Sequence, residues 1–171
     1  KLDISADPYL ALYNEYFGGG MNAIVFQEMR EARGLAYSAN ARLYDPAHKD
    51  DTYMYYAFIA TQNDKMKTAI DAFDDIINQM PESETAFEVA KEALVTRLRT
   101  ERTTGYDILH SYLSDRELGI NVSRNKLVFE TVPSLTLADV KAAQEKWVKD
   151  RVYVYGILGD IKDLDMAYLE T

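Results

Sequence analysis

The segment EYFGGGMNAIVFQEMREARGLAYS, from Glu15 to Ser38, indicates two helices joined by a glycine turn and followed by a strand. Apolar residues at the helical spacing of three or four occur on both sides of the glycines: Leu10, Tyr13 and Phe17 before, Ile24, Val25, Met29 and Ala32 after. We expect Gly18 to Gly20 to end the first helix in a left-handed turn, a conformation that glycine adopts readily. The second helix is predicted from Met21 to Ala32.

The residues after Gly34 alternate with the period of a strand, with Leu35, Tyr37, Ala39, Ala41 and Leu43 on one face. The sequence DPAHKDD (45–51) has the composition of a turn. It is followed by TYMYYAFIA (52–60), an almost unbroken aromatic and apolar run. That run predicts a central strand buried on both faces, paired with the previous strand as a hairpin.

The rest of the chain is predicted to be mainly helical. Helical spacing or a capping signal marks four segments: 66–80, 83–98, 105–119 and 136–147. The segment KLVFETV (126–132) remains undetermined, RVYVYGILGD (151–160) predicts a final strand, and a short helix ends the chain. The order predicts an α+β fold, an antiparallel or mixed β-sheet with helices packed mainly on one face.

Composition limits the function classes. A chain of 171 residues fits one domain, here 1–171, and its net charge of −9 without a basic stripe argues against a nucleic-acid partner. It contains no cysteine and no apolar run long enough for a transmembrane segment. Because it opens at Lys1, without an initiator methionine, we expect an excised portion of a longer protein.

Common catalytic motifs are missing. The glycine triplet follows a helix and has no lysine, so it is a turn rather than a phosphate loop. The two histidines, His48 in an acidic turn and His110 on a helix, do not form a zinc motif, and no G-x-S-x-G elbow is present. We therefore expect this chain to bind no metal and no cofactor.

Arg30 and Tyr37 lie seven positions apart, where the second helix gives way to the strand. In the structural interpretation, Arg30 is a solvated cation at a helix end and Tyr37 is a core residue on the apolar strand face. In the functional interpretation, both are fixed hydrogen-bond donors that hold one carbonyl oxygen and the oxyanion it becomes. Spacing alone leaves both interpretations open.

The same segment closely resembles the signature of the insulinase/pitrilysin family of zinc metallopeptidases, which includes the mitochondrial processing peptidases. Family members carry a glycine-rich turn, a phrase such as Leu-Phe-Gln-x-Leu-Arg-Glu, and then Gly-Leu-Ala-Tyr-Ser. Here these are VFQEMRE (25–31) and GLAYS (34–38). The order of helices and strands agrees over nearly the whole chain, and residues 151–160 resemble the family's closing strand.

The resemblance implies a division of labour between paired domains that enclose a peptide. One half carries an inverted H-x-x-E-H motif and binds Zn²⁺, and the other contributes an arginine and a tyrosine to the substrate carbonyl. This chain lacks that motif and has Arg30 and Tyr37 at the family's spacing, so it resembles the zinc-free, C-terminal type of domain. It is then expected to be inactive alone, with catalytic Arg30 and Tyr37 and with Zn²⁺ in a homologous partner domain or subunit.

Family domains usually begin with a strand that this chain lacks, so we expect a free sheet edge that can recruit another chain, including a second copy. The alternative function is a catalytically inactive scaffold subunit, because the family also includes core subunits of respiratory complexes. An unrelated binding module is the third hypothesis. The compartment stays open, with the bacterial periplasm or cell envelope as the working expectation.

Overall fold

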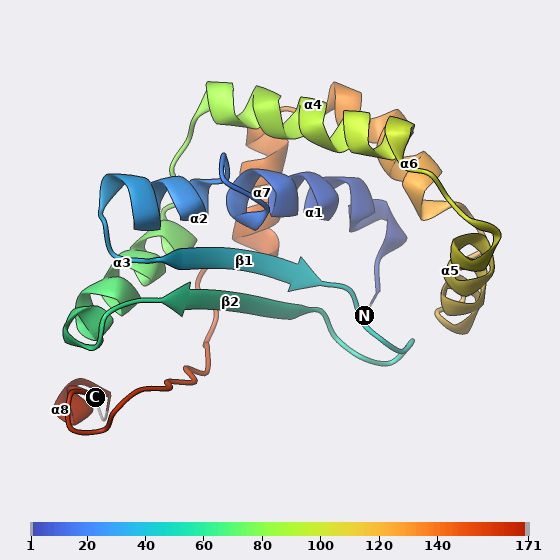
Figure 1. Cartoon of the computed structure of the whole chain (residues 1–171). Coiled ribbons are helices and arrows are strands. Elements are labelled where there is room, and N and C mark those ends of the chain that lie inside the picture. Colours follow the sequence, from blue (N-terminus) through green and yellow to red (C-terminus); the bar gives the residue numbers. More distant parts are fainter. Residues whose placement is uncertain (1, 170–171) are drawn as a thin grey trace.

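The computed structural model describes residues 2 to 169 and has one layer of two antiparallel strands beside a larger set of helices (Figure 1). The strands are β1 (Ser38–Tyr44) and β2 (Met54–Ala60). The longer helices are α1 (Asp7–Tyr13), α3 (Met66–Asn78), α4 (Glu84–Thr100), α5 (Gly105–Glu117), α6 (Arg124–Thr131) and α7 (Leu137–Trp147). The short helices are η1 (Ile4–Ala6), α2 (Ile24–Phe26), η4 (Asn63–Lys65), η5 (Val132–Ser134) and α8 (Met166–Leu169). The α+β prediction is confirmed.

Two helices end in wider π-helical turns, η2 (Asn14–Gly18) after α1 and η3 (Gln27–Ala32) after α2. Side-chain caps begin α4 and α7, among other helices. Ser83 accepts a hydrogen bond from the third residue of α4, and Thr136 forms a capping box with Asp139 at the start of α7. Residues 126–132, undetermined from sequence, belong to α6 and the first residue of η5.

The helices cover one face of the hairpin. Ala39, Ala41 and Leu43 of β1 are buried among them, while the cross-strand pairs on the other face are exposed. That open face includes Met54, Tyr56 and Phe58, with 58%, 49% and 43% of each residue exposed. The prediction that residues 52–60 form a strand buried on both faces is therefore wrong. An apolar run does not show how many faces other elements cover.

The glycine turn has a different cause from the predicted one. Gly19 has a φ of −85°, and the positive-φ glycines among the described residues are Gly34 and Gly119, so the predicted left-handed turn is wrong. A Cβ atom on Gly18 would lie 1.7 Å from the backbone oxygen of Ala41. Glycine is needed at position 18 because the end of the first helix packs directly against the backbone of β1.

The prediction of a final strand at residues 151–160 is wrong, because the segment runs without regular secondary structure (Figure 1). Two of its tyrosines are held by hydroxyl contacts: Tyr153 donates to the Val148 carbonyl oxygen and Tyr155 donates to Asp74, each at 2.6 Å. The alternate residues Val152 and Val154 are almost fully exposed. Alternating side chains predict a strand, but a strand also requires a neighbouring backbone, and here tyrosine side chains hold the segment instead.

Helix α5 stands apart from the helical layer (Figure 1) and has no buried residue. Its large apolar side chains, Tyr106, Ile108, Leu109, Tyr112 and Leu113, are all more than half exposed. At about 100° per residue they occupy one side of the helix. The sequence predicted this helix from its apolar spacing, but in the described part of the chain its apolar face stays largely exposed.

Candidate functional site

The two residues singled out in the sequence lie on one connector, residues 30–37, which runs from the last turn of η3 to the start of β1. Arg30 lies in the last turn of η3, and Gly34 follows with a φ of 59°, a left-handed conformation that favours glycine. The backbone then folds back onto the helix, since the N–H groups of Leu35 and Ala36 donate to the Met29 carbonyl oxygen at 2.8 and 3.2 Å. Arg30 is thus presented from a helix end whose exit is fixed by hydrogen bonds.

Tyr37 lies immediately before β1, at a bend in the chain. Its N–H donates to the carbonyl oxygen of Ala60 at 2.8 Å, which ties it to the end of β2. Although it shares the strand parity of buried Ala39, 68% of Tyr37 is exposed. Its hydroxyl oxygen accepts a hydrogen bond from Gln62 Nε2 at 3.3 Å. The interpretation of Tyr37 as a core residue is therefore wrong.

Arg30 and Arg33 are held very differently, although both lie near the end of η3. Arg33 Nη2 donates to Asp75 of α3 at 3.3 Å, so its guanidinium fastens two helices together. The Arg30 side chain is 50% exposed, lies over the Phe26 ring with 4.9 Å from Cζ to the centroid, and has its Nε 3.7 Å from Glu31. Arg30 is thus the arginine that remains free to donate to an external group.

The structure places both predicted residues on one short connector with exposed polar ends. Within residues 2–169 no hydrogen bond joins the side chains of Arg30 and Tyr37, so their convergence on one point stays a prediction. A guanidinium and a phenol are both donors, and together they suit a carbonyl oxygen that gains negative charge. The two side chains themselves supply donors, and the carboxylate of Glu31 lies beside Arg30 at 3.7 Å.

Sequence reasoning missed Gln62. The signal that could have found it is the hairpin register, in which Ser38 faces Ala60. When this register is continued past the strand ends, residue 61 falls opposite Tyr37, and Gln62 is the next residue along. The alternation pattern identified the strands but not their register.

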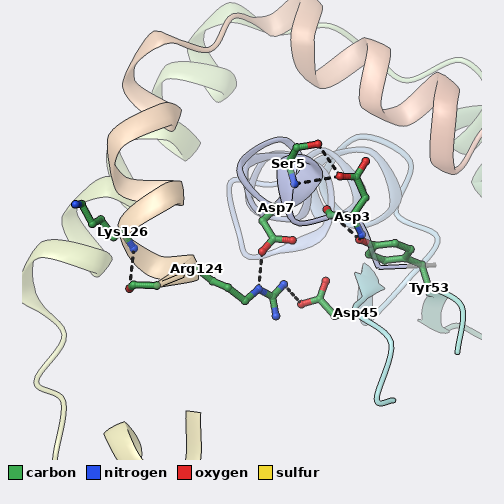
Figure 2. A network of polar contacts seen from close by, with 8 residues as sticks. Asp3, Ser5, Asp7, Asp45, Tyr53, Arg124 and Lys126 are labelled. Carbon is green, nitrogen blue, oxygen red and sulfur yellow. Dashed lines mark hydrogen bonds and ion pairs between the residues drawn. The ribbon is translucent and has the colours of Figure 1, made fainter. Parts of the chain in front are cut away.

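A second charged cluster, also unpredicted, joins the start of α1, the hairpin turn and the start of α6 (Figure 2). Arg124 donates through Nε to Asp7 and through Nη2 to Asp45, each at 2.5 Å. The Asp7 side chain is only 3% exposed. Burial raises the pKa of Asp7, although the hydrogen bond from Arg124 opposes the shift. Desolvation lowers the pKa of Arg124, but its bonds to both carboxylates outweigh that effect and raise it overall. This cluster therefore holds the starts of α1 and α6 to the hairpin turn.

Neither histidine belongs to a metal site. His48 is exposed and lies 3.4 Å from a carboxylate oxygen of Glu117, and the His110 ring is 5.9 Å from the Tyr106 ring. Among the described residues, no group of three or more histidine, cysteine or acidic side chains is placed to hold a metal ion. The zinc that the family implies therefore does not fit residues 2–169.

Two shallow depressions lie away from the connector. One, of about 340 Å³, is lined by residues from two segments, 78–82 and 141–149. The other, of about 500 Å³, lies between α3 and the C-terminal segment. Neither includes Arg30 or Tyr37. Over the described part of the chain, no helix is both long and apolar enough to cross a membrane.

Comparison with known proteins places the chain in a family. The family model for the peptidase M16 inactive domain matches residues 6–94, just over half of the 171 residues. A crystal structure of a peptidase M16 inactive domain from Pseudomonas fluorescens is similar, with a TM-score of 0.68 and 19% sequence identity. The similarity covers 82% of this chain and 34% of that one, so this chain spans about a third of its length.

No curated protein matches the chain. The matched residues 6–94 include the glycine turn, Arg30, Tyr37, the hairpin and most of α4. The family resemblance of the sequence is therefore confirmed. The chain belongs to the M16 peptidase family as an inactive domain of that family.

Proposed function

We propose that this chain is the substrate-binding, zinc-free half of an insulinase-like zinc endopeptidase. Arg30 and Tyr37 hold the scissile carbonyl of a peptide that is enclosed between this chain and a zinc-bearing homologous domain or subunit. The observation that carries the proposal is that both donors extend into solvent from one fixed connector, while neighbouring Arg33 is used to fasten helices. Membership of the inactive-domain family supports the same role.

In this role the chain binds and orients the peptide. The Tyr37 hydroxyl and the Arg30 guanidinium donate to the carbonyl oxygen and gain strength as negative charge develops there. Zn²⁺ and its ligands belong to the partner, since residues 2–169 offer no ligand cluster. The open hairpin face, with Met54, Tyr56 and Phe58, supplies exposed apolar surface of the kind that an enclosed peptide or paired domain covers.

The test is a pair of substitutions in the assembled peptidase, this chain with its zinc-bearing partner. Tyr37→Phe removes one hydroxyl and keeps the ring, and it is expected to lower kcat about 10²- to 10³-fold, the usual effect of losing one oxyanion donor. Arg30→Ala is expected to cause a similar loss, with a raised KM where the guanidinium also binds the ground state. A mixture of fluorescence-quenched peptides identifies one that is cleaved, and initial rates on that peptide over a range of concentrations give kcat and KM for both variants.

Matched controls are available in the chain. Tyr106→Phe removes a hydroxyl from an exposed tyrosine on α5, and Arg99→Ala removes a guanidinium that lies over the Phe129 ring at 5.9 Å. Both controls should retain full activity. The double variant of Arg30 and Tyr37 should lose less than the sum of the two free energies if both donors serve one oxygen.

A stable Tyr37→Phe variant with full kcat would refute the proposal and favour the scaffold function, which has no need of the pair. Zinc analysis tests whether the metal is held by the partner and not by this chain. The purified chain alone should hold no stoichiometric zinc and cleave no peptide, and Arg30→Ala and Tyr37→Phe should leave the zinc content of the assembly unchanged.

The homodimer through a sheet edge also remains a proposal. Among the described residues β1 pairs only with β2, so each strand has an unpaired edge. Unpaired edges can recruit another strand. Sedimentation of the purified chain over a range of concentrations tests this, and a monomer at every concentration would exclude the dimer.

A further inference from the structure

The segment after β2 fastens the connector that carries Tyr37. The carbonyl oxygen of Ala60 accepts the Tyr37 N–H at 2.8 Å, and the Thr61 hydroxyl donates to the Leu35 carbonyl oxygen at 2.5 Å. These bonds fix the backbone on both sides of Ala36. They do not set the direction of the Tyr37 hydroxyl, which lies at the far end of an exposed ring.

Gln62 provides the contact at that end. Its Nε2 donates to the Tyr37 hydroxyl oxygen at 3.3 Å. A phenol has one proton to donate, and an oxygen that accepts from a neighbour keeps that proton available for another acceptor. Lys65 is the cation nearest to Gln62 in the sequence, and it donates instead to the Gly34 carbonyl oxygen at 3.4 Å. The contact to the hydroxyl therefore comes from a neutral side chain.

We propose that Gln62 is a positioning residue that holds the Tyr37 hydroxyl as an acceptor, so that its proton points to the substrate carbonyl. The inference rests on the proposed function and adds a residue to the same site. Its physical basis is preorganisation: a hydroxyl aimed in advance needs no reorientation when the oxyanion forms. An unrestrained hydroxyl on a ring that is 68% exposed would instead share its proton with water.

Two substitutions separate donation from shape. Gln62→Met keeps the length of the side chain and removes the donor. Gln62→Glu keeps the shape but leaves only acceptors, so the Tyr37 hydroxyl has to donate to the new carboxylate and loses its proton for the substrate. In the assembled peptidase, Gln62→Met should lower kcat roughly 2- to 10-fold, the equivalent of one ordinary hydrogen bond. Gln62→Glu should lower it further, and neither should change KM appreciably.

The decisive measurement repeats both substitutions in the Tyr37→Phe background. If Gln62 acts through the Tyr37 hydroxyl, neither change lowers kcat further there. A loss that persists undiminished would overturn the inference. Gln79→Met and Gln79→Glu are matched controls on an exposed glutamine at the end of α3, and they should leave kcat unchanged.

The outcomes distinguish this inference from the proposed function. A fully active Tyr37→Phe variant overturns the proposed function, whereas an impaired Tyr37→Phe variant with unaffected Gln62 variants overturns only the inference. A second readout needs no substrate. In the full chain with ¹³Cζ-labelled tyrosine, Gln62→Met should move the Tyr37 resonance and Gln79→Met should not, and an unmoved resonance would refute the contact.

Discussion

Arg124→Ala removes the guanidinium that donates to the buried carboxylate of Asp7 at the start of α1 (Figure 2). One oxygen of that carboxylate, Oδ1, is buried and has no hydrogen-bond partner among the described residues. After the substitution the other oxygen loses its partner as well. The change therefore leaves a buried charge without compensation and also releases α6 from the hairpin turn at Asp45.

The magnitude follows from burial. Removing one partner of a buried ion pair costs about 3–5 kcal/mol. The Asp7 side chain is 3% exposed but that of Arg124 is 23% exposed, which favours the lower end. The Asp45 side chain is 41% exposed, so its share is at most about 1 kcal/mol. We expect Arg124→Ala to lower the free energy of unfolding by about 3 kcal/mol at pH 7.

The loss should depend on pH with a definite sign. The pKa of Asp7 is raised by burial above its ordinary 3.8, and without Arg124 it rises further. The folded state then binds a proton more tightly than the unfolded chain, so the unfolding free energy falls as pH rises through the folded-state pKa. The difference between variant and wild type should be largest at pH 7. It should shrink toward about 1 kcal/mol near pH 4, where a neutral carboxyl is buried instead.

Urea unfolding at pH 7 and pH 4 measures the effect. If the unfolding free energy falls by about 2 kcal/mol per molar urea, a loss of about 3 kcal/mol lowers the urea midpoint by about 1.5 M. Lys126→Ala is the control on the same helix. Its ion pair with Glu130 is exposed on both sides, so its cost should stay within about 0.5 kcal/mol. In an Asp7→Asn background, Arg124→Ala should cost about 1 kcal/mol or less. A loss below about 1 kcal/mol at pH 7, or one that grows as the pH falls, would refute the reasoning.

Two further pairs of substitutions test the packing of the helices. Gly18→Ala should destabilise the chain by about 1–3 kcal/mol or more because its Cβ would overlap the Ala41 carbonyl oxygen, whereas Gly20→Ala, whose Cβ meets nothing within 4 Å, should be nearly neutral. Leu94→Ala in the buried face of α4 should cost about 2–5 kcal/mol, but Leu109→Gln on exposed α5 should change stability by less than about 0.5 kcal/mol. Thermal and urea unfolding of the four variants checks both statements, and equal losses within either pair would contradict them.

Helices such as α3 and α7 could be predicted because they carry local signals that agree with their environment. Phe73, Ile76 and Ile77 lie at helical spacing and are buried in α3, and Thr136 begins α7 with the capping box that its sequence offers. These signals depend on residues three or four apart. Tertiary packing then acts on elements that have already been specified locally.

The sheet was harder to predict because strand pairing and coverage are long-range properties. Residues 52–60 and 151–160 both carry strand-forming side chains, yet one forms β2 with an open face and the other forms no strand. The difference lies in the neighbouring backbone. β2 has β1 beside it, whereas the later segment is held through Tyr153 and Tyr155, whose hydroxyl groups donate outside any ladder.

The candidate site shows the same division between local and long-range information. Sequence spacing places Arg30 near a helix end and Tyr37 near a strand start, and the structure has both there. The alternation pattern also predicted that Tyr37 lies on the buried face. This is wrong because the chain bends at Tyr37 and exposes its ring, and no local sequence signal predicts that bend. The partner of its hydroxyl, Gln62, lies 25 positions away and depends on hairpin register. The sequence of a segment therefore predicts which donors are present. The fold decides which neighbours each donor contacts, and so which proton it can give to a ligand.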